Sequence, residues 1–228
     1  MGFDECAPTY DEQLRRGVRL SGRSPEWFAR QRVEVVRAYQ ERIGRRPVDI
    51  VEFGCGVGNH VPILRSAFRG SRIVGIDISR QSLSVARRRH GRWDVRFCTP
   101  GEFDEAQSAD LLYVNGVFHH IPPAEHARWL GYFRRLLRPG GTAAIFDNNP
   151  FSPAARLVMR LIPFDRESVM VNPYRFGALM SRCGFSAPQL HFHFLFPHAL
   201  TFLRPLEHLF RSWPLGAQFG LIAHPATL

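Results

Sequence analysis

The sequence predicts an α/β protein built on a doubly wound, mostly parallel β-sheet. Short apolar segments of strand length, such as 49–53 and 72–76, alternate with segments of helical periodicity. The first strand runs directly into three glycines, Gly54, Gly56 and Gly58. A glycine turn of this kind accepts positive φ angles and lets a ligand approach the backbone closely. We therefore expect a ligand-binding loop at the edge of the sheet.

The remaining elements follow in order from caps, breakers and periodicity. Ser24-Pro25 begins a helix that Gly44 ends, and Ser79 caps a helix that runs to about Arg89. From residue 190 to residue 196, apolar residues recur at every second position, which is typical of a strand. The other predicted helices are 59–68, one that starts at Pro123, and two short ones within 153–184; the other predicted strands are 94–98, 109–114, 142–146 and 218–223.

The spacing of the glycine loop separates two kinds of ligand. Dinucleotide sites use G-x-G-x-x-G, whereas this loop reads G-x-G-x-G and is followed by Asn59. Glu52 precedes the loop, and its carboxylate would repel a pyrophosphate but suits a cationic ligand. Asp77, at the end of the second strand, can accept hydrogen bonds from ribose hydroxyls in either kind of site. Asp77 alone does not discriminate between them.

Four motifs, in this order along the chain, carry a family resemblance. They are Glu-Phe-Gly-Cys-Gly-Val-Gly from Glu52, Gly-Ile-Asp-Ile-Ser from Gly75, Asn-Gly-Val-Phe-His-His-Ile-Pro from Asn115 and Leu-Arg-Pro-Gly-Gly from Leu137. With these motifs the chain resembles the class I S-adenosylmethionine (SAM)-dependent methyltransferases, of the type 11/12-like group. The resemblance implies a Rossmann-like, seven-stranded, mostly parallel sheet with an antiparallel C-terminal strand, and SAM as the cofactor. A Rossmann-like domain with another ligand is the alternative.

The loops and strand ends supply the candidate cofactor site. In many family members an Asp after the third strand holds the adenine; here Pro100 stands near that place, and Glu102 is the substitute candidate, unless it is only a solvated turn residue. The predicted cofactor-binding residues are Glu52, Gly54, Cys55, Gly56, Gly58, Asn59, Asp77, Ile78, Glu102, Asn115 and Val117.

His119 and His120 follow the fourth predicted strand and are the candidate catalytic residues. Ligands in open α/β sheets bind outside the carboxyl ends of the strands, so this pair should face the transferred group. An imidazole titrates near neutral pH and can act as a general base if the acceptor must lose a proton. The alternative is that the pair only orients its loop. We expect no metal site, because no carboxylate joins the histidines at ligand spacing.

Composition is consistent with one domain over residues 1–228, with an N-terminal arm and helix in 1–44. That arm either closes over the cofactor or is disordered.

The formal charge is +10 and every basic residue is arginine, which would attract anionic partners. The four scattered cysteines indicate a reducing cytoplasm. No signal peptide and no membrane-spanning segment is expected, although a peripheral membrane contact is compatible with the sequence.

Residues 197–217 form an insertion between the last two predicted strands, far longer than a simple hairpin loop. Its apolar residues Leu203, Leu206, Phe210 and Trp213 follow helical spacing beside arginines. Three interpretations are open: a lid over an apolar acceptor, a peripheral membrane contact, or ordinary core. For the acceptor we expect a small or lipid-linked molecule; the alternatives are RNA or protein, or a SAM-binding regulator without turnover. The oligomeric state is left open.

Overall fold

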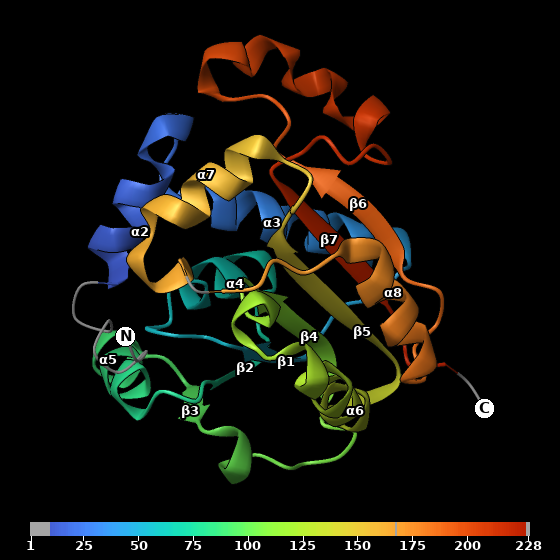
Figure 1. The fold of residues 1–228 in the computed structure, drawn as a ribbon. Helices are drawn as coiled ribbons and strands as arrows, with labels where there is room; N and C mark the ends of the chain where they lie inside the picture. The colour runs from blue at the N-terminus through green and yellow to red at the C-terminus, as the bar shows by residue number, and fades with distance from the viewer. Residues whose placement is uncertain (1–9, 167, 227–228) are drawn as a thin grey trace.

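The computed structural model describes residues 10–166 and 168–226, and these form one seven-stranded sheet flanked by helices (Figure 1). The strands lie in the order β3-β2-β1-β4-β5-β7-β6. All neighbouring pairs are parallel except those made by β7, which is antiparallel to both β5 and β6. The predicted fold class, with its antiparallel C-terminal strand, is confirmed.

The strands agree with the predicted segments to within a few residues, apart from β5 and β6. They are β1 (Asp49–Phe53), β2 (Arg72–Ile76), β3 (Val95–Cys98), β4 (Ala109–Asn115), β5 (Leu137–Asn148), β6 (Gln189–His193) and β7 (Gln218–Ala223). β5 begins five residues before the predicted start at 142, because Leu137 pairs with Ala109 across an irregular register. β6 ends earlier than predicted, since Phe194 has φ +63° and turns the chain out of the sheet.

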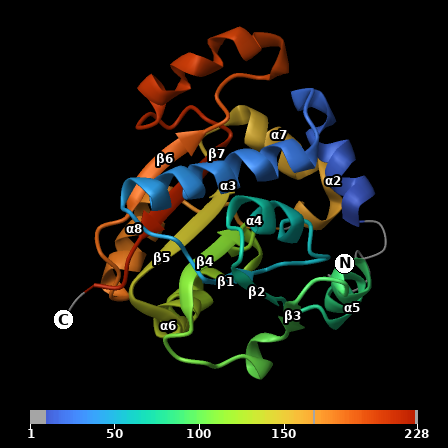
Figure 2. The same cartoon turned by 180° about the vertical axis from the view of Figure 1, so that it is seen from behind.

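Helices cover both faces of the sheet. The α-helices are α2 (Tyr10–Val18), α3 (Pro25–Arg42), α4 (Val61–Ala67), α5 (Arg80–His90), α6 (His126–Leu136), α7 (Pro153–Leu161) and α8 (Pro173–Arg182). The 3-10 segments are η1 (Arg19–Ser21), η2 (Pro100–Glu102), η3 (Phe118–His120), η4 (Pro123–Glu125), η5 (Pro163–Asp165) and η6 (His198–Phe210). Helices α3 and α4 lie on one face (Figure 2), and α6 and α8 lie on the other. None of the helices in the described ranges is long and apolar enough to cross a membrane.

The predicted helix caps are present. The Ser24 hydroxyl accepts a hydrogen bond from the amide of Trp27 at 3.2 Å and so begins α3. The Ser79 hydroxyl accepts one from the amide of Ser82 at 3.0 Å at the start of α5. Each cap satisfies a donor that the first helical turn leaves without a partner. The predicted helix at Pro123 starts as the 3-10 turn η4 and becomes α6 at His126.

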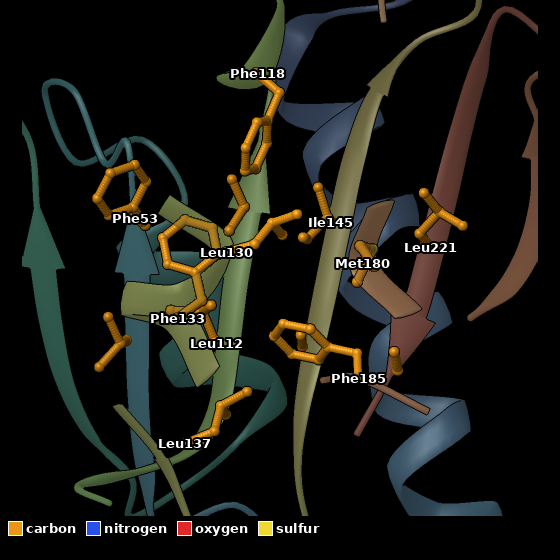
Figure 3. Close-up of a cluster of buried hydrophobic side chains, with 14 of the residues drawn as sticks. Phe53, Leu112, Phe118, Leu130, Phe133, Leu137, Ile145, Met180, Phe185 and Leu221 are labelled. Carbon is orange, nitrogen blue, oxygen red and sulfur yellow. The ribbon is translucent and has the colours of Figure 1, made fainter. Parts of the chain in front are cut away.

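Two large apolar clusters hold helices against the sheet, and a smaller third one joins α5 to β3. One cluster joins α6 and α8 to the strands, and its labelled members extend across the sheet from Phe53 and Phe133 to Met180 and Leu221 (Figure 3). The second joins α3 and α4 to the opposite face through residues such as Val36 and Leu64. Because both faces are covered, the central strands are buried throughout, and only their ends are accessible to a ligand. A ligand site must therefore lie at the ends of the strands.

The insertion at 197–217 consists mainly of η6 and contributes no buried side chain from that helix. None of the four residues predicted to share a face is fully buried: Leu206 is 44% and Trp213 is 57% exposed, and Leu203 and Phe210 are half-buried. In Figures 1 and 2 the insertion lies beyond the sheet edge, next to α3 and α7. The interpretation of its apolar residues as ordinary core is therefore wrong.

Candidate functional site

A cavity of about 770 Å³ lies at the carboxyl ends of the parallel strands. One side is formed by the glycine loop after β1 and by the residues that follow β2 and β4. We call this the strand side. The other side is formed by residues of α2, α3, α7 and η5 and by the chain from Phe194 into η6. We call this the helix side.

The glycine loop is shaped by backbone contacts. The amides of Gly54 and Cys55 both donate to the carbonyl of Ile76 at the end of β2, at 2.7 and 3.1 Å. Gly54 has φ +74°, and a Cβ placed there would lie 2.2 Å from a methyl carbon of Val117. Gly56 has φ +51°, but a Cβ there would meet nothing within 4 Å. Gly54 is thus required for packing, whereas Gly56 leaves open space beside the cavity.

Asp77 lies on the strand side and is tied to the same loop. Its carboxylate accepts hydrogen bonds from the amides of Gly56 at 2.7 Å and Ser79 at 2.9 Å. Burial raises the pKa of Asp77, while these two amides act in the opposite direction. Ile78, the next residue, is 63% exposed and also lines the cavity. Asp77 therefore fixes the loop and presents its carboxyl group at the strand side.

Glu52 lies behind the cavity wall. One carboxylate oxygen contacts Nδ1 of His60 at 2.8 Å, and the other is buried without a hydrogen-bond partner. His60 itself lines the cavity, and its Nε2 also has no partner. Sequence reasoning missed His60, although its place directly after Asn59 at the start of α4 could have suggested it.

Other predicted residues secure the loop from behind. Asn59 lines the cavity, and its amide donates to the Asp11 carboxylate of α2 at 2.8 Å, so the N-terminal arm closes onto this loop. Gly58 has φ +81° and packs against His90. Cys55 is buried at the cavity wall, and burial raises the pKa of its thiol well above the usual value.

Glu102 lies away from the cavity lining. Its carboxylate accepts a hydrogen bond from the Thr99 amide at 2.8 Å in a capping box, and Arg80 contacts it at 3.2 Å. That geometry favours the alternative interpretation of Glu102, as a solvated residue that closes a turn. No adenine contact is assigned to it.

Asn115 and Val117 follow β4 and both line the strand side. The Asn115 side-chain oxygen is buried and has no hydrogen-bond partner, so an acceptor for a ligand donor is available there. Val117 packs onto Gly54 and holds the loop after β4 close to the glycine loop.

His119 is held between two carboxylates. Its Nδ1 lies 2.5 Å from Asp147 at the end of β5, and its Nε2 lies 3.3 Å from Asp165 in η5. Burial disfavours the charged imidazole, but the two carboxylates outweigh burial and raise the pKa of His119 to about 10. At neutral pH His119 is then an imidazolium without a lone pair. His120 is therefore the remaining candidate for the general base.

His120 also faces the cavity, and its Nε2 lies 3.1 Å from the same Asp165 oxygen. Burial would raise the pKa of Asp165, but the two histidines hold it below its usual value. The two histidines and Asp165 offer ligand atoms within 4.8 Å of one another. The premise that no carboxylate joins the pair is therefore wrong, because the fold supplies one from a distant segment. His119 contacts the carboxylates of both Asp147 and Asp165.

The helix side contains residues that the sequence did not assign to the site, namely Arg32, Trp27 and Phe28 of α3 and Asp165 of η5. Phe28 packs edge-on against Phe194 at 4.9 Å between ring centroids. No local motif marks these residues. Their chemistry arises from elements that are far apart in the sequence.

Comparisons with known proteins agree with this geometry. A family model described as a methyltransferase domain matches residues 51–143. A trans-aconitate 2-methyltransferase from Azoarcus sp. is 32% identical over 152 residues, which is 61% of this chain and 57% of that protein. A trans-aconitate 2-methyltransferase from Methylobacterium radiotolerans is 29% identical over 140 residues, covering 59% and 53% of the two chains. The chain thus spans about half the length of the curated relatives that it matches.

Solved structures share the fold at low sequence identity. Phosphoethanolamine N-methyltransferase 2 from Haemonchus contortus, in complex with S-adenosyl-L-methionine, superposes with a TM-score of 0.66 at 15% identity, covering 100% of this chain and 60% of that one. A SAM-dependent methyltransferase from Archaeoglobus fulgidus gives a TM-score of 0.59 at 15% identity, covering 84% and 94%. At this identity the similarity concerns the fold.

Proposed function

We propose that the chain is a class I SAM-dependent methyltransferase, an enzyme that transfers the methyl group of SAM to a small-molecule acceptor. The observation that carries this proposal is one cavity that joins the glycine loop and Asp77 to the His120–Asp165 pair. A cofactor on the strand side and an acceptor on the helix side would meet within it.

The residues on the strand side fit SAM. Gly56 leaves open space beside the loop, and the Asp77 carboxyl group is placed to accept from ribose hydroxyls. The partnerless oxygen of Asn115 is suited to the cationic amino acid end of SAM. Glu52, which lies behind the wall and contacts His60, would attract that end through its negative charge. Buried acceptors without partners are rare in folded proteins, so a ligand that donates to them would explain their presence. Of the predicted cofactor residues, Gly58 and Glu102 are assigned structural roles.

When bound, SAM supplies a methyl group already activated by its sulfonium, so the protein mainly has to position and align the acceptor. Such alignment can lower the barrier by about 7 to 11 kcal/mol. Where the acceptor must lose a proton, His120 accepts it, and Asp165 orients His120 and stabilises the imidazolium that forms. His119, fixed by Asp147 and Asp165, positions the loop after β4. His119 thus has the orienting role that was the alternative for the pair.

A small acceptor is favoured because the helix side encloses the cavity. Pro197, His198 and Arg204 of the insertion line it, which supports the insertion as a lid. A lipid-linked acceptor or a peripheral membrane contact would use the exposed apolar residues of η6, such as Phe202. The relatives named for trans-aconitate methylation support a small acceptor over RNA or protein. A cytoplasmic location remains a prediction.

The experiment is methyl transfer from isotope-labelled SAM to extracts separated into small-molecule, lipid, RNA and protein pools. We expect label in the small-molecule pool. For an acceptor that must lose a proton, we expect His120→Asn to lower the rate by about 10² to 10⁴ while binding of the product S-adenosylhomocysteine (SAH) changes little. Addition of EDTA should leave the rate unchanged. Cofactor binding without label in any pool would instead indicate a regulator.

A further inference from the structure

Arg32 of α3 is a buried cation on the helix side of the cavity. Its exposed fraction is 6%, and it is among the residues that line the cavity. It lies on the helix face toward the sheet, between the core residues Ala29 and Val36. Arginine is rarely buried to this degree unless an opposite charge accompanies it. Arg32 therefore requires an explanation that packing alone does not supply.

The partners of Arg32 within the protein are neutral. Its Nη1 donates to the side-chain oxygen of Gln218 at 2.8 Å. The nearby hydroxyl of Tyr113 is also neutral at pH 7, because burial raises the pKa of Tyr113 to about 12. In the described part of the chain no carboxylate lies within 4.0 Å of Arg32, and its buried Nε has no hydrogen-bond partner. The guanidinium charge is therefore not neutralised by these residues.

A chain of hydrogen bonds fixes the guanidinium at the cavity wall. Gln218, at the start of β7, accepts from Arg32 and donates to the Asn148 side chain at 3.1 Å. Both Gln218 and Asn148 line the cavity. Asn148 directly follows Asp147, which holds His119 at 2.5 Å. The buried cation is thus connected, through consecutive residues at the end of β5, to the group formed by His119, His120 and Asp165. We call this group the histidine cluster, and it is where we place the chemistry.

We propose that Arg32 binds a carboxylate group of the methyl acceptor, with Gln218 and Asn148 as positioning residues. This inference rests on the proposed function, since it names the acceptor class for the same cavity. A buried charge without a counterion is unfavourable, and a carboxylate supplies one negative charge together with acceptors that match the guanidinium fork. A phosphate dianion shares the anionic oxygen chemistry but would bring more charge than a single arginine neutralises.

The test uses the full chain saturated with SAH and measures the rise in melting temperature with added anions. The probes are succinate and trans-aconitate, with the neutral trimethyl ester of trans-aconitate and inorganic phosphate as comparison ligands. The variants are Arg32→Met, which keeps the length of the side chain but removes its charge, and Arg30→Met, which removes an exposed arginine of the same helix.

We expect at least one carboxylate to stabilise both the wild type and Arg30→Met, with no effect from the ester. Arg32→Met should bind that carboxylate about 10- to 100-fold more weakly, as is typical when a charge-assisted hydrogen bond is lost. Its melting temperature without anion should stay the same or rise, because an uncompensated buried charge is removed.

Three results would overturn the inference: equal stabilisation of wild type and Arg32→Met, stabilisation by phosphate alone, or no stabilisation by any carboxylate. SAH binding separates this failure from failure of the proposed function. If wild type and Arg32→Met both bind SAH and only the carboxylate effect is missing, the acceptor assignment is wrong and the cofactor assignment stands. If SAH itself does not bind, the proposed function is wrong.

Discussion

The two sides of the cavity are built in different ways. The strand side consists of backbone turns and side chains at the ends of adjacent strands, within short contiguous motifs. The helix side is assembled from α2, α3, α7, η5 and the insertion, which are far apart in the sequence. Under the proposed function, cofactor binding therefore depends on local backbone geometry, whereas acceptor selection depends on the packing of segments that are distant in the sequence.

The largest effect should come from Gly54→Ala on the strand side. An alanine there would adopt an unfavourable positive φ and collide with Val117, which together should cost about 2 to 5 kcal/mol of folding free energy. SAH binding should be lost with it. Chemical denaturation and calorimetry measure both effects.

Gly70→Ala is the matched control, because Gly70 has φ +83° but open space at the Cβ position. Its cost should be only about 1 to 2 kcal/mol, without loss of SAH affinity. Adding Val117→Ala to Gly54→Ala should recover part of the stability. If Gly54→Ala behaves like Gly70→Ala, the strand side does not depend on the close approach of these two loops.

The histidine cluster, where the two sides meet, should make stability depend on pH. His119 has a raised pKa of about 10 against 6.5 when unfolded, so its contribution is fully present below 6.5 and is lost as pH rises toward 10. The loss can reach about 1.4 kcal/mol per pH unit. Urea unfolding between pH 7 and 9.5 should show a steeper loss for wild type than for His119→Gln. Parallel slopes would contradict the imidazolium assignment.

Asp77 and Glu102 are both predicted cofactor residues, but only Asp77 lines the cavity, so variants of the two should differ in cofactor affinity. Asp77→Asn keeps the shape but removes the charge, and should weaken SAH binding about 10-fold or more, since charge-assisted hydrogen bonds contribute about 1.5 to 3 kcal/mol. Glu102→Gln, outside the cavity lining, should leave SAH affinity unchanged. Calorimetry on both variants decides, and equal affinities for Asp77→Asn and wild type would refute the ribose assignment.

The fold and the strand side could be predicted because their signals are local. Glycine spacing, helix caps at Ser24 and Ser79, and apolar periodicity follow from backbone geometry within a few residues. Asp165 and Arg32 could not be predicted as site residues, since their positions follow only from tertiary packing. The same reason explains the error about the carboxylate at the histidine pair. The predicted strand β6 is too long because apolar residues still alternate in the sequence beyond Phe194, where the backbone turns out of the sheet.

The smallest effect on stability should come from the insertion. Phe202→Ser and Leu209→Ser change side chains that are 74% and 61% exposed, so the melting temperature should stay nearly constant. If the insertion is a lid, acceptor turnover should fall while SAH affinity is retained. Liposome co-sedimentation of wild type and variants tests the membrane interpretation. A large drop in melting temperature would mean that these side chains contribute to folding stability, and would contradict their placement at the surface.

The central claim is that the strand side binds SAM, and calorimetric titration of the purified chain with SAH tests it most directly. A parallel titration with NAD controls for the shared sheet architecture. We predict micromolar affinity for SAH and no binding of NAD. Binding of NAD without binding of SAH would contradict the account, because the glycine loop and Asp77 would then serve a dinucleotide.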